Sequence, residues 1–292
     1  MTALTERPTA LLVAVSRPWF WPVSWVPAYL GTVLAGHSWL PADTGRALVA
    51  LVVLGPLVWG AVLAQNDLHD LPSDRANPRK ATAPLVTGAV SDGRLRFWYR
   101  VLALASLGAA LLVGPLFVLG VAGVLALGRA YSVPPLRLKT RPGWDVTVNA
   151  LVVGLVAPAA GWAITRAPWE FPWPIGVIGV LFAAALYVPT TVIDLAADTG
   201  AGDTTFAVRF GARTAYRLGL GLWGAALAVC LLSAAFDVVV PRSTLVPQLV
   251  TVPILLGGYA ALTRHPTISR LAVVSVLFGI PTAGFAAAYL AA

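Results

Sequence analysis

Charged residues are scarce in this sequence of 292 residues. Only 11% of the residues are charged, whereas about a quarter are charged in typical water-soluble domains. Hydrophobic residues make up 58% of the chain, and the mean hydropathy is +0.81. Too little polar surface remains to cover a water-soluble fold of this size, so the composition predicts an integral membrane protein.

Cysteine occurs once, as Cys230. A single cysteine excludes a disulfide within the chain and a zinc or iron-sulfur site built on cysteine ligands. The sequence also lacks a glycine-rich phosphate loop, a Gly-x-Ser-x-Gly elbow and a histidine pair at metal-ligand spacing. These absences exclude several common classes of catalytic site and direct attention to the acidic residues.

Long apolar runs make up most of the chain. A bilayer core about 30 Å thick needs roughly 20 apolar residues per helix, and fewer where a helix is broken or buried in protein. By that measure the sequence predicts a single domain, residues 1–292, with nine membrane spans: 10–36, 46–65, 97–112, 116–130, 147–165, 175–193, 215–236, 245–262 and 270–290. Gly114-Pro115 is the turn signal that separates the third span from the fourth. We expect an all-α, polytopic membrane helix bundle that encloses a central apolar cavity open near the cytoplasmic side.

The basic residues give this bundle an orientation, because cytoplasmic loops of membrane proteins are enriched in Lys and Arg. With the amino terminus placed in the cytoplasm, only Arg46, Arg166 and Arg242 of the 20 basic residues lie outside. The net charge of +8 is therefore mainly a topology signal, and no nucleic-acid partner is expected. We expect an integral protein of a bacterial inner membrane, surrounded by lipid, with a cytoplasmic amino terminus.

Half of the 12 acidic residues are concentrated in two short stretches. The first acidic cluster is Asp67, Asp70 and Asp74, and the second acidic cluster is Asp194, Asp198 and Asp203. The first cluster follows the second span at spacings of three and four, which place its members on one face if the helix continues. The second cluster follows the sixth span. Both clusters lie at the cytoplasmic ends of their spans, so the bundle is predicted to bring them together.

Magnesium suits such a site, because carboxylate oxygens are hard ligands. In proteins it is held by one or two carboxylates, with waters and substrate phosphates in its other positions. Two acidic clusters at the edge of an apolar cavity therefore suit a ligand with a diphosphate head and a hydrocarbon tail. The metal would neutralise charge as the diphosphate leaves. Four basic residues of the intervening loops are expected to assist the diphosphate: Arg79, Lys80, Arg137 and Lys139.

These residues resemble the signatures of the UbiA superfamily of intramembrane prenyltransferases. The first motif, Asn-Asp-x-x-Asp-x-x-x-Asp, is matched at Asn66, Asp67, Asp70 and Asp74. The second, Asp-x-x-x-Asp followed by Gly and Thr, is matched at Asp194, Asp198, Gly202 and Thr205. The segment from Tyr131 to Lys139 looks like the loop between the two motifs in the chlorophyll synthase-like branch.

The resemblance implies magnesium-dependent transfer of a prenyl group from an isoprenyl diphosphate to a lipophilic or aromatic acceptor, through an allylic cation. It implies catalytic roles for Asp67, Asp70, Asp194 and Asp198, and a metal-ligand set that adds Asn66 and Asp74. Tyr131 joins the basic residues in the implied diphosphate site. This chain departs from the family at Ala83-Pro84-Leu85, where many members have Arg-Pro-Leu. Either Arg79 and Lys80 supply the missing charge, or this member handles its substrate differently.

Two other functions stay open. Some UbiA relatives are terpene cyclases, in which a double bond of the substrate itself captures the cation, for example that of geranylgeranyl diphosphate. A short, aromatic pocket would favour cyclisation, since the faces of Trp and Phe stabilise a cation. A transporter could use intramembrane acids as an ion path. The transporter is disfavoured, because the outward halves of the predicted spans contain no acids.

Overall fold

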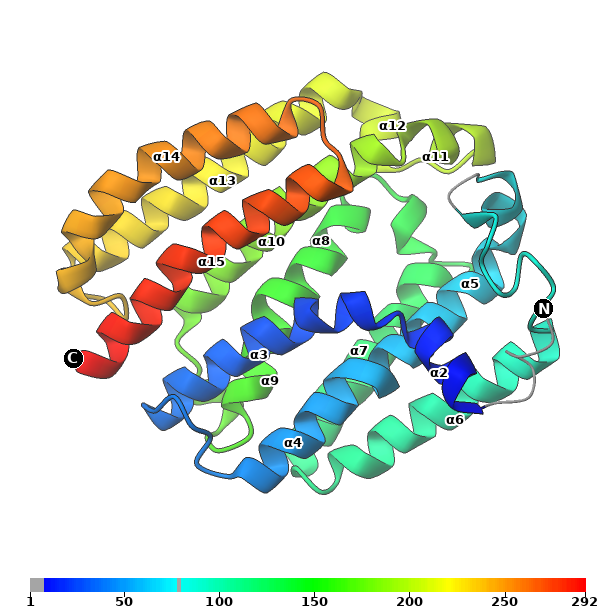
Figure 1. Cartoon of the computed structure of the whole chain (residues 1–292), viewed down its shortest axis with the longest axis horizontal. Helices are drawn as coiled ribbons and strands as arrows, with labels where there is room; N and C mark the ends of the chain where they lie inside the picture. Colours follow the sequence, from blue (N-terminus) through cyan, green and yellow to red (C-terminus); the bar gives the residue numbers. More distant parts are fainter. Residues whose placement is uncertain (1–7, 78–79) are drawn as a thin grey trace.

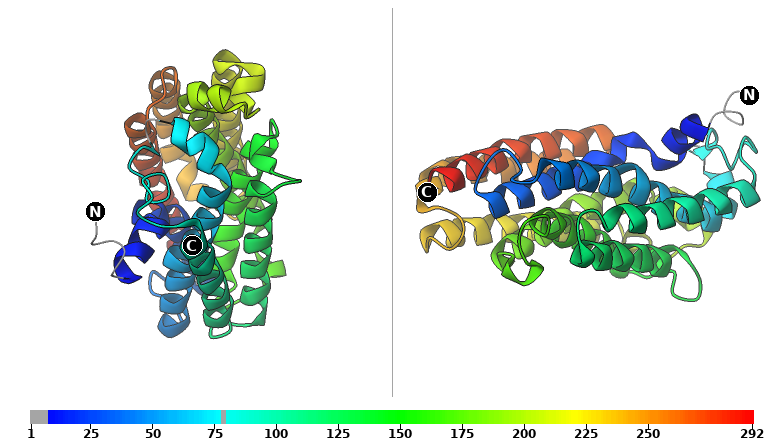
Figure 2. Two further views of the ribbon diagram at one scale, coloured as in Figure 1. Left: turned by 90° about the vertical axis from the view of Figure 1, so that its right-hand side faces the viewer. Right: turned by 90° about the horizontal axis from the view of Figure 1, so that it is seen from below.

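The computed structural model describes residues 8–77 and 80–292, and all regular structure in these ranges is helical. The longer helices run side by side in an elongated bundle (Figures 1 and 2). The first half of the chain forms α2 (Pro8–Ser16), α3 (Trp21–Gly36), α4 (Thr44–Val52), α5 (Val58–Ala76), α6 (Asp92–Ala110) and α7 (Pro115–Ser132). The second half forms α8 (Trp144–Leu151), α9 (Ala157–Trp162), α10 (Trp173–Ile193), α11 (Leu195–Ala201), α12 (Phe206–Phe210), α13 (Ala212–Ala235), α14 (Leu245–Thr263) and α15 (Ile268–Ala291). The predicted all-α membrane bundle is confirmed.

Seven of the described helical segments are long and apolar enough to cross a membrane. The first and third predicted spans are not among them. Arg17 separates α2 from α3 with a left-handed backbone, φ 47°, and α3 alone has 16 residues. α6 has 19 residues, but its first half carries Asp92, Arg94, Arg96 and Arg100. The total of nine spans stays a prediction, whereas the turn at Gly114 between α6 and α7 is confirmed.

Two of the membrane segments contain a wider, π-helical turn. The turn η2 (Val53–Leu57) joins α4 to α5, and η5 (Val152–Val156) joins α8 to α9. A wider turn interrupts the regular hydrogen-bond ladder, and in lipid the backbone groups it frees need protein partners. Near η2 the partners come from α3, because Ser24 Oγ donates to the Leu54 carbonyl at 2.9 Å and Trp25 Nε1 to the Leu51 carbonyl at 2.8 Å.

Glycine allows two pairs of helices to approach at backbone distance. A Cβ on Gly161 of α9 would lie 1.7 Å from the carbonyl oxygen of Ala28 in α3. A Cβ on Gly154 of η5 would lie 2.3 Å from the carbonyl of Gly179 in α10. Lipid is as apolar as the helix surfaces, so close van der Waals packing between small residues is a main source of attraction here.

Aromatic side chains fill the interior between α10, α13, α14 and α15. Trp223 and Tyr259 are buried and stacked, with ring centroids 4.8 Å apart, and Phe182 and Phe278 complete the cluster. The Tyr259 hydroxyl donates to the Ala185 carbonyl at 2.7 Å, so its polar atom is satisfied within the core. These rings give the carboxyl-terminal helices a solid interior. The predicted central cavity stays a prediction.

Candidate active site

The first acidic cluster lies on a continuous helix. α5 runs from Val58 to Ala76 and therefore carries Asp67, Asp70 and Asp74 on its last turns. Asp67 and Asp74 are each only 8% exposed, which is unusual for carboxylates and requires compensating charge. The predicted continuation of the helix through the motif is confirmed.

Arg17 contacts both carboxylate oxygens of Asp67 in this cluster. Its Nη2 lies 2.6 Å from Asp67 Oδ1 and 2.7 Å from Asp67 Oδ2, so both carboxylate oxygens accept from one guanidinium nitrogen. The arginine reaches the cluster from the break between α2 and α3. Sequence analysis missed this role, and the available signal was a charge inside the first apolar run.

Two lysines complete the compensation of the first cluster. Lys80 Nζ lies 3.2 Å from Asp74 Oδ2 and 3.8 Å from Asp67 Oδ1. Lys139 forms an ion pair with Asp70, and its Nζ donates to Asn66 Oδ1 at 3.0 Å. Burial lowers the pKa of Lys139, whereas the Asp70 carboxylate opposes that shift. Charged Lys139 therefore depends on Asp70 beside it.

The second acidic cluster begins where α10 ends. Asp194 is the residue between α10 and α11, and Asp198 lies within α11. Gly202, with φ 74°, ends α11 in the left-handed conformation that glycine adopts without strain. Thr205 Oγ1 donates to Asp198 Oδ2 at 3.0 Å, which fixes this carboxylate against the start of α12.

Arg137 joins the two clusters. Its Nη2 lies 3.4 Å from Asp70 Oδ1 in the first cluster, and its Nη1 lies 3.2 Å from Asp203 Oδ1 in the second. α11 also packs against α5, and both lie at the same end of the bundle (Figure 1). The structure therefore places the two acidic stretches on opposite sides of one guanidinium.

Tyr131 lies at the end of α7. Its hydroxyl shares a hydrogen bond with Tyr187 of α10 at 2.8 Å and accepts one from Asn149 Nδ2 of α8 at 2.9 Å. The next residue, Ser132, donates to Asn66 Oδ1 at 3.2 Å. The loop between the motifs thus contacts both α5 and α10. Tyr187 and Asn149 were not predicted, because nothing in their local sequence pairs them with Tyr131.

Asp145, at the start of α8, is a second residue that sequence analysis missed. It is 1% exposed and accepts from the backbone N–H of Gly143 at 2.8 Å and of Phe206 at 2.7 Å. The carboxylate therefore caps the start of α12, directly after the second motif. Its available signal was an acid at the edge of an apolar run.

Arg17 and Lys80 supply positive charge near Asp67 in this chain, which has Ala83 where it departs from the family motif. Ala83 lies in a turn, with its N–H donating to the Lys80 carbonyl at 2.8 Å. Lys80 and Arg17 both reach the first cluster, so two cations stand beside Asp67. Arg79, the other predicted substitute, lies outside the described residues.

The donor chemistry of the site fits magnesium. All six predicted metal ligands offer side-chain oxygen, the donor type that Mg²⁺ prefers. Within the described part of the chain, however, no three carboxylate, imidazole or thiolate groups converge on one point. Carboxylates of the first cluster face cations instead. A bound Mg²⁺ would compete with these cations for the same carboxylates.

Fold and site together define a class: a polytopic helical membrane protein in which two acidic motifs on different helices meet at one end of the bundle. The sequence model of the UbiA prenyltransferase family matches residues 24–265. The chain belongs to this family. Among curated relatives, a lycopene elongase/hydratase of Halobacterium salinarum is 31% identical over 228 residues, which cover 73% of this chain and 75% of that protein.

Chlorophyll synthase of Arabidopsis thaliana is 26% identical over 211 residues, or 66% of this chain and 53% of that protein. The chain thus spans about half the length of this relative. A UbiA homolog from Archaeoglobus fulgidus, solved bound to DMAPP and Mg²⁺, has a TM-score of 0.75 at 24% identity. That alignment covers 96% of this chain and 98% of the homolog. This structural likeness shows that nearly the whole chain has the fold of that homolog.

Proposed function

We propose that this protein is a magnesium-dependent intramembrane prenyltransferase. It ionises an isoprenyl diphosphate and transfers the prenyl group to a lipophilic or aromatic acceptor, with release of diphosphate. The observation that carries this proposal is the position of Arg137 between Asp70 and Asp203. A diphosphate head bound beside Arg137 would lie next to both acidic motifs and next to the basic residues of the loop after α7.

The carboxylates and the cations have different parts in this proposal. The oxygens of Asn66, Asp67, Asp70, Asp74, Asp194 and Asp198 would hold Mg²⁺, which when bound supplies positive charge to the leaving diphosphate. Arg137, Lys139, Lys80 and Arg17 are paired with carboxylates and lie within reach of the same place. Guanidinium and ammonium groups bind phosphate oxygens well, so these cations exchange carboxylate for diphosphate when substrate arrives.

Relatives support the chemical class of both substrates. Neighbouring folds have been solved with DMAPP and with GPP, each together with Mg²⁺. Homologous proteins include a chlorophyll synthase, a probable homogentisate phytyltransferase and a lycopene elongase/hydratase. These names include the isoprenoids phytyl and lycopene, together with chlorophyll and the aromatic compound homogentisate. We infer the same two classes for this chain.

Replacement of one carboxylate in each cluster tests the proposal. Asp67→Asn and Asp194→Ala should each lower turnover at least about a hundredfold, while the protein remains folded by size-exclusion chromatography. Asp92→Ala is the matched control, because Asp92 pairs with Arg96 on an exposed helix surface. EDTA should stop turnover and Mg²⁺ restore it. Near-normal turnover in either cluster variant, or indifference to EDTA, would contradict the metal role.

Incubation with geranylgeranyl diphosphate alone separates transfer from cyclisation. A transferase consumes little of this substrate without an acceptor, and product appears when a lipophilic acceptor is added. A cyclic hydrocarbon formed without acceptor would identify the protein as a terpene cyclase instead. Both results require the same metal-bound diphosphate, so this comparison leaves the proposed site unchanged.

A further inference from the structure

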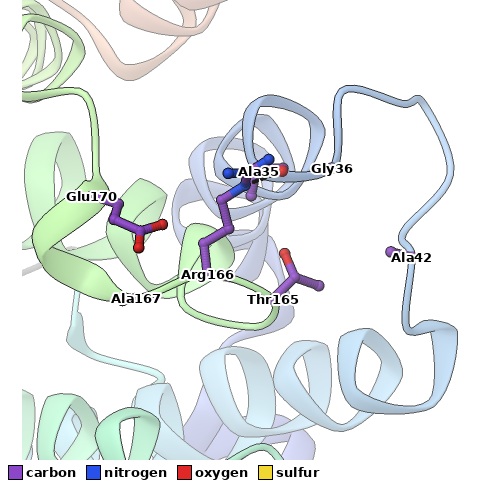
Figure 3. Close-up of a pocket in the computed structure, with 7 residues that line it drawn as sticks. All are labelled: Ala35, Gly36, Ala42, Thr165, Arg166, Ala167 and Glu170. Carbon is purple, nitrogen blue, oxygen red and sulfur yellow. Dashed lines mark hydrogen bonds between the residues drawn. The ribbon is translucent and has the colours of Figure 1, made fainter.

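A hollow lies at the end of the bundle opposite the acidic clusters (Figure 1). This hollow is open to the surface and has a volume of about 420 Å³. It lies between the loop after α3 and the loop after α9, with Ala35 and Gly36 on one side and Thr165, Arg166 and Glu170 on the other (Figure 3). This volume is in the range of small-ligand sites. Nothing in the proposed transfer reaction uses it.

Two opposite charges face this hollow without pairing with each other. Arg166 Nε donates to the Ala35 carbonyl at 2.7 Å, and the guanidinium lies 5.6 Å from the centre of the Trp162 ring. The arginine is therefore fixed at its inner nitrogen, while among the described residues its outer nitrogens have no hydrogen-bond partner. Glu170 has no ion pair or hydrogen bond through its carboxylate in the same part of the chain. Both residues line the hollow, and Figure 3 shows Arg166 reaching Ala35 while the Glu170 carboxylate stands apart from it.

Exposed aromatic residues surround this end of the molecule. Trp169 is 71% exposed, Trp173 58% and Trp39 47%, all in or beside the two loops that form the hollow. Tryptophan collects at the membrane–water boundary, where its indole ring meets headgroups. This arrangement favours a position of the hollow at headgroup depth.

We propose that this hollow binds a phospholipid headgroup of the phosphoethanolamine type. The outer nitrogens of Arg166 would donate to the phosphate, which suits the forked guanidinium. The Glu170 carboxylate would accept from the primary ammonium. A choline headgroup has no N–H to donate to Glu170, and a glycerol headgroup leaves this carboxylate without a cation. The site is thus selective for one headgroup, independently of the enzymatic proposal.

Native mass spectrometry of the full chain in detergent tests this selectivity. Phosphatidylethanolamine, phosphatidylcholine and phosphatidylglycerol with identical acyl chains are added in turn. We expect phosphatidylethanolamine to be retained about two- to fivefold more than either of the others, as for an exposed pair of charges. Equal retention of the three lipids would overturn the proposal.

Two variants locate the site. Glu170→Gln should reduce retention of phosphatidylethanolamine to that of phosphatidylcholine, whereas Arg166→Gln should reduce retention of both, because both lipids carry the phosphate. Arg46→Gln is the control, since Arg46 pairs with Asp43 on the exposed surface between α3 and α4. If Glu170→Gln still retained phosphatidylethanolamine more strongly than phosphatidylcholine, the proposed headgroup site would be refuted. The Glu170→Gln result is sufficient by itself if Arg166→Gln fails to fold.

Soluble phosphoethanolamine distinguishes a lipid from a free zwitterion. Added at the concentration of the lipid, it should compete poorly, because it lacks acyl chains that could contact the exposed tryptophans beside the hollow. Equal competition would overturn the lipid assignment.

Discussion

At the scale of single residues, the candidate active site is a balance of buried and half-buried charges. Arg17 and Asp67 keep only 15% and 10% of their side-chain surface exposed. Each group costs free energy to remove from water, and the pair is favourable only while both members are present. The ion pairs therefore hold α5, the α2–α3 break and the two loops together.

Arg17→Gln should destabilise the protein because it leaves Asp67 without its bidentate partner. Removal of one member of a fully buried pair costs about 3–5 kcal/mol. Lys80 remains 3.8 Å from the same carboxylate, so we expect a smaller loss, about 1–3 kcal/mol. Thermal unfolding in detergent measures it.

Arg46→Gln is the control for this prediction, because the Arg46–Asp43 pair has side chains 52% and 44% exposed. Such a surface pair contributes at most about 1 kcal/mol. Equal losses in Arg17→Gln and Arg46→Gln would show that the Arg17–Asp67 pair is not a structural contact.

At the scale of helices, Asp145 connects two elements that are far apart in sequence. It binds the N–H groups of Gly143 and Phe206, and α12 then places Thr205 against Asp198. The second acidic cluster thus depends on a residue of α8. The residues next to Asp198 in the sequence do not indicate this dependence, because it arises from the packing of α8 against the start of α12.

Asp145→Asn should loosen the start of α12. The amide offers one acceptor oxygen in place of two, so one buried N–H loses its partner at a cost of about 1–3 kcal/mol. Hydrogen exchange at residues 204–210 should accelerate. Asp237→Asn is the matched control, since Asp237 accepts from the Arg242 N–H at 2.8 Å in an exposed loop. Unchanged exchange at residues 204–210 would argue against the capping role.

Gly161→Ala should disrupt the approach of α9 to α3. The added methyl would lie 1.7 Å from the Ala28 carbonyl, a distance that only backbone movement can relieve. We expect a loss of folded protein, measured as the monodisperse fraction after purification. Gly123→Ala in α7 meets nothing within 4 Å and should be neutral or raise stability by about 0.4–1 kcal/mol. Similar yields for both variants would show that the α3–α9 contact tolerates separation.

At the scale of the whole molecule, orientation can be tested by labelling introduced cysteines, because the chain has a single cysteine, Cys230, to replace. With Cys230 replaced by Ala, cysteine is introduced either at Gly93, near the acidic clusters, or at Ser38, at the opposite end. Both positions are exposed. A membrane-impermeant maleimide should label Ser38→Cys in intact cells, and Gly93→Cys only after the cells are opened. The reverse pattern would invert the proposed topology.

The comparisons agree with the bundle at this scale. Neighbours that share 24% identity or less overlay nearly the full chain, so the fold is far more constrained than the sequence. Helical membrane folds tolerate such divergence, because many apolar side chains satisfy the same lipid-facing or packed position.

Composition, apolar runs and the spacing of Asp67, Asp70 and Asp74 were enough to predict a helical membrane protein with two acidic motifs. Those features are local, because hydropathy and helical periodicity depend only on residues that follow one another in the sequence. Short-range turn signals such as Gly114 were equally readable. The number of spans was harder to predict. α3 is helical but has only 16 residues, and α6 is long enough but carries four charged residues in its first half.

Only the tertiary structure decided which charges compensate which. Arg17 reaches Asp67 across 50 residues, Arg137 stands between Asp70 and Asp203, and Asp145 binds Phe206 across 61 residues. Each contact depends on how distant helices pack, and glycines such as Gly161 set that packing through backbone approach. The sequence by itself determined the medium, the helices and the chemistry on offer. Long-range packing determined which of these charged side chains lie next to one another at one end of the bundle.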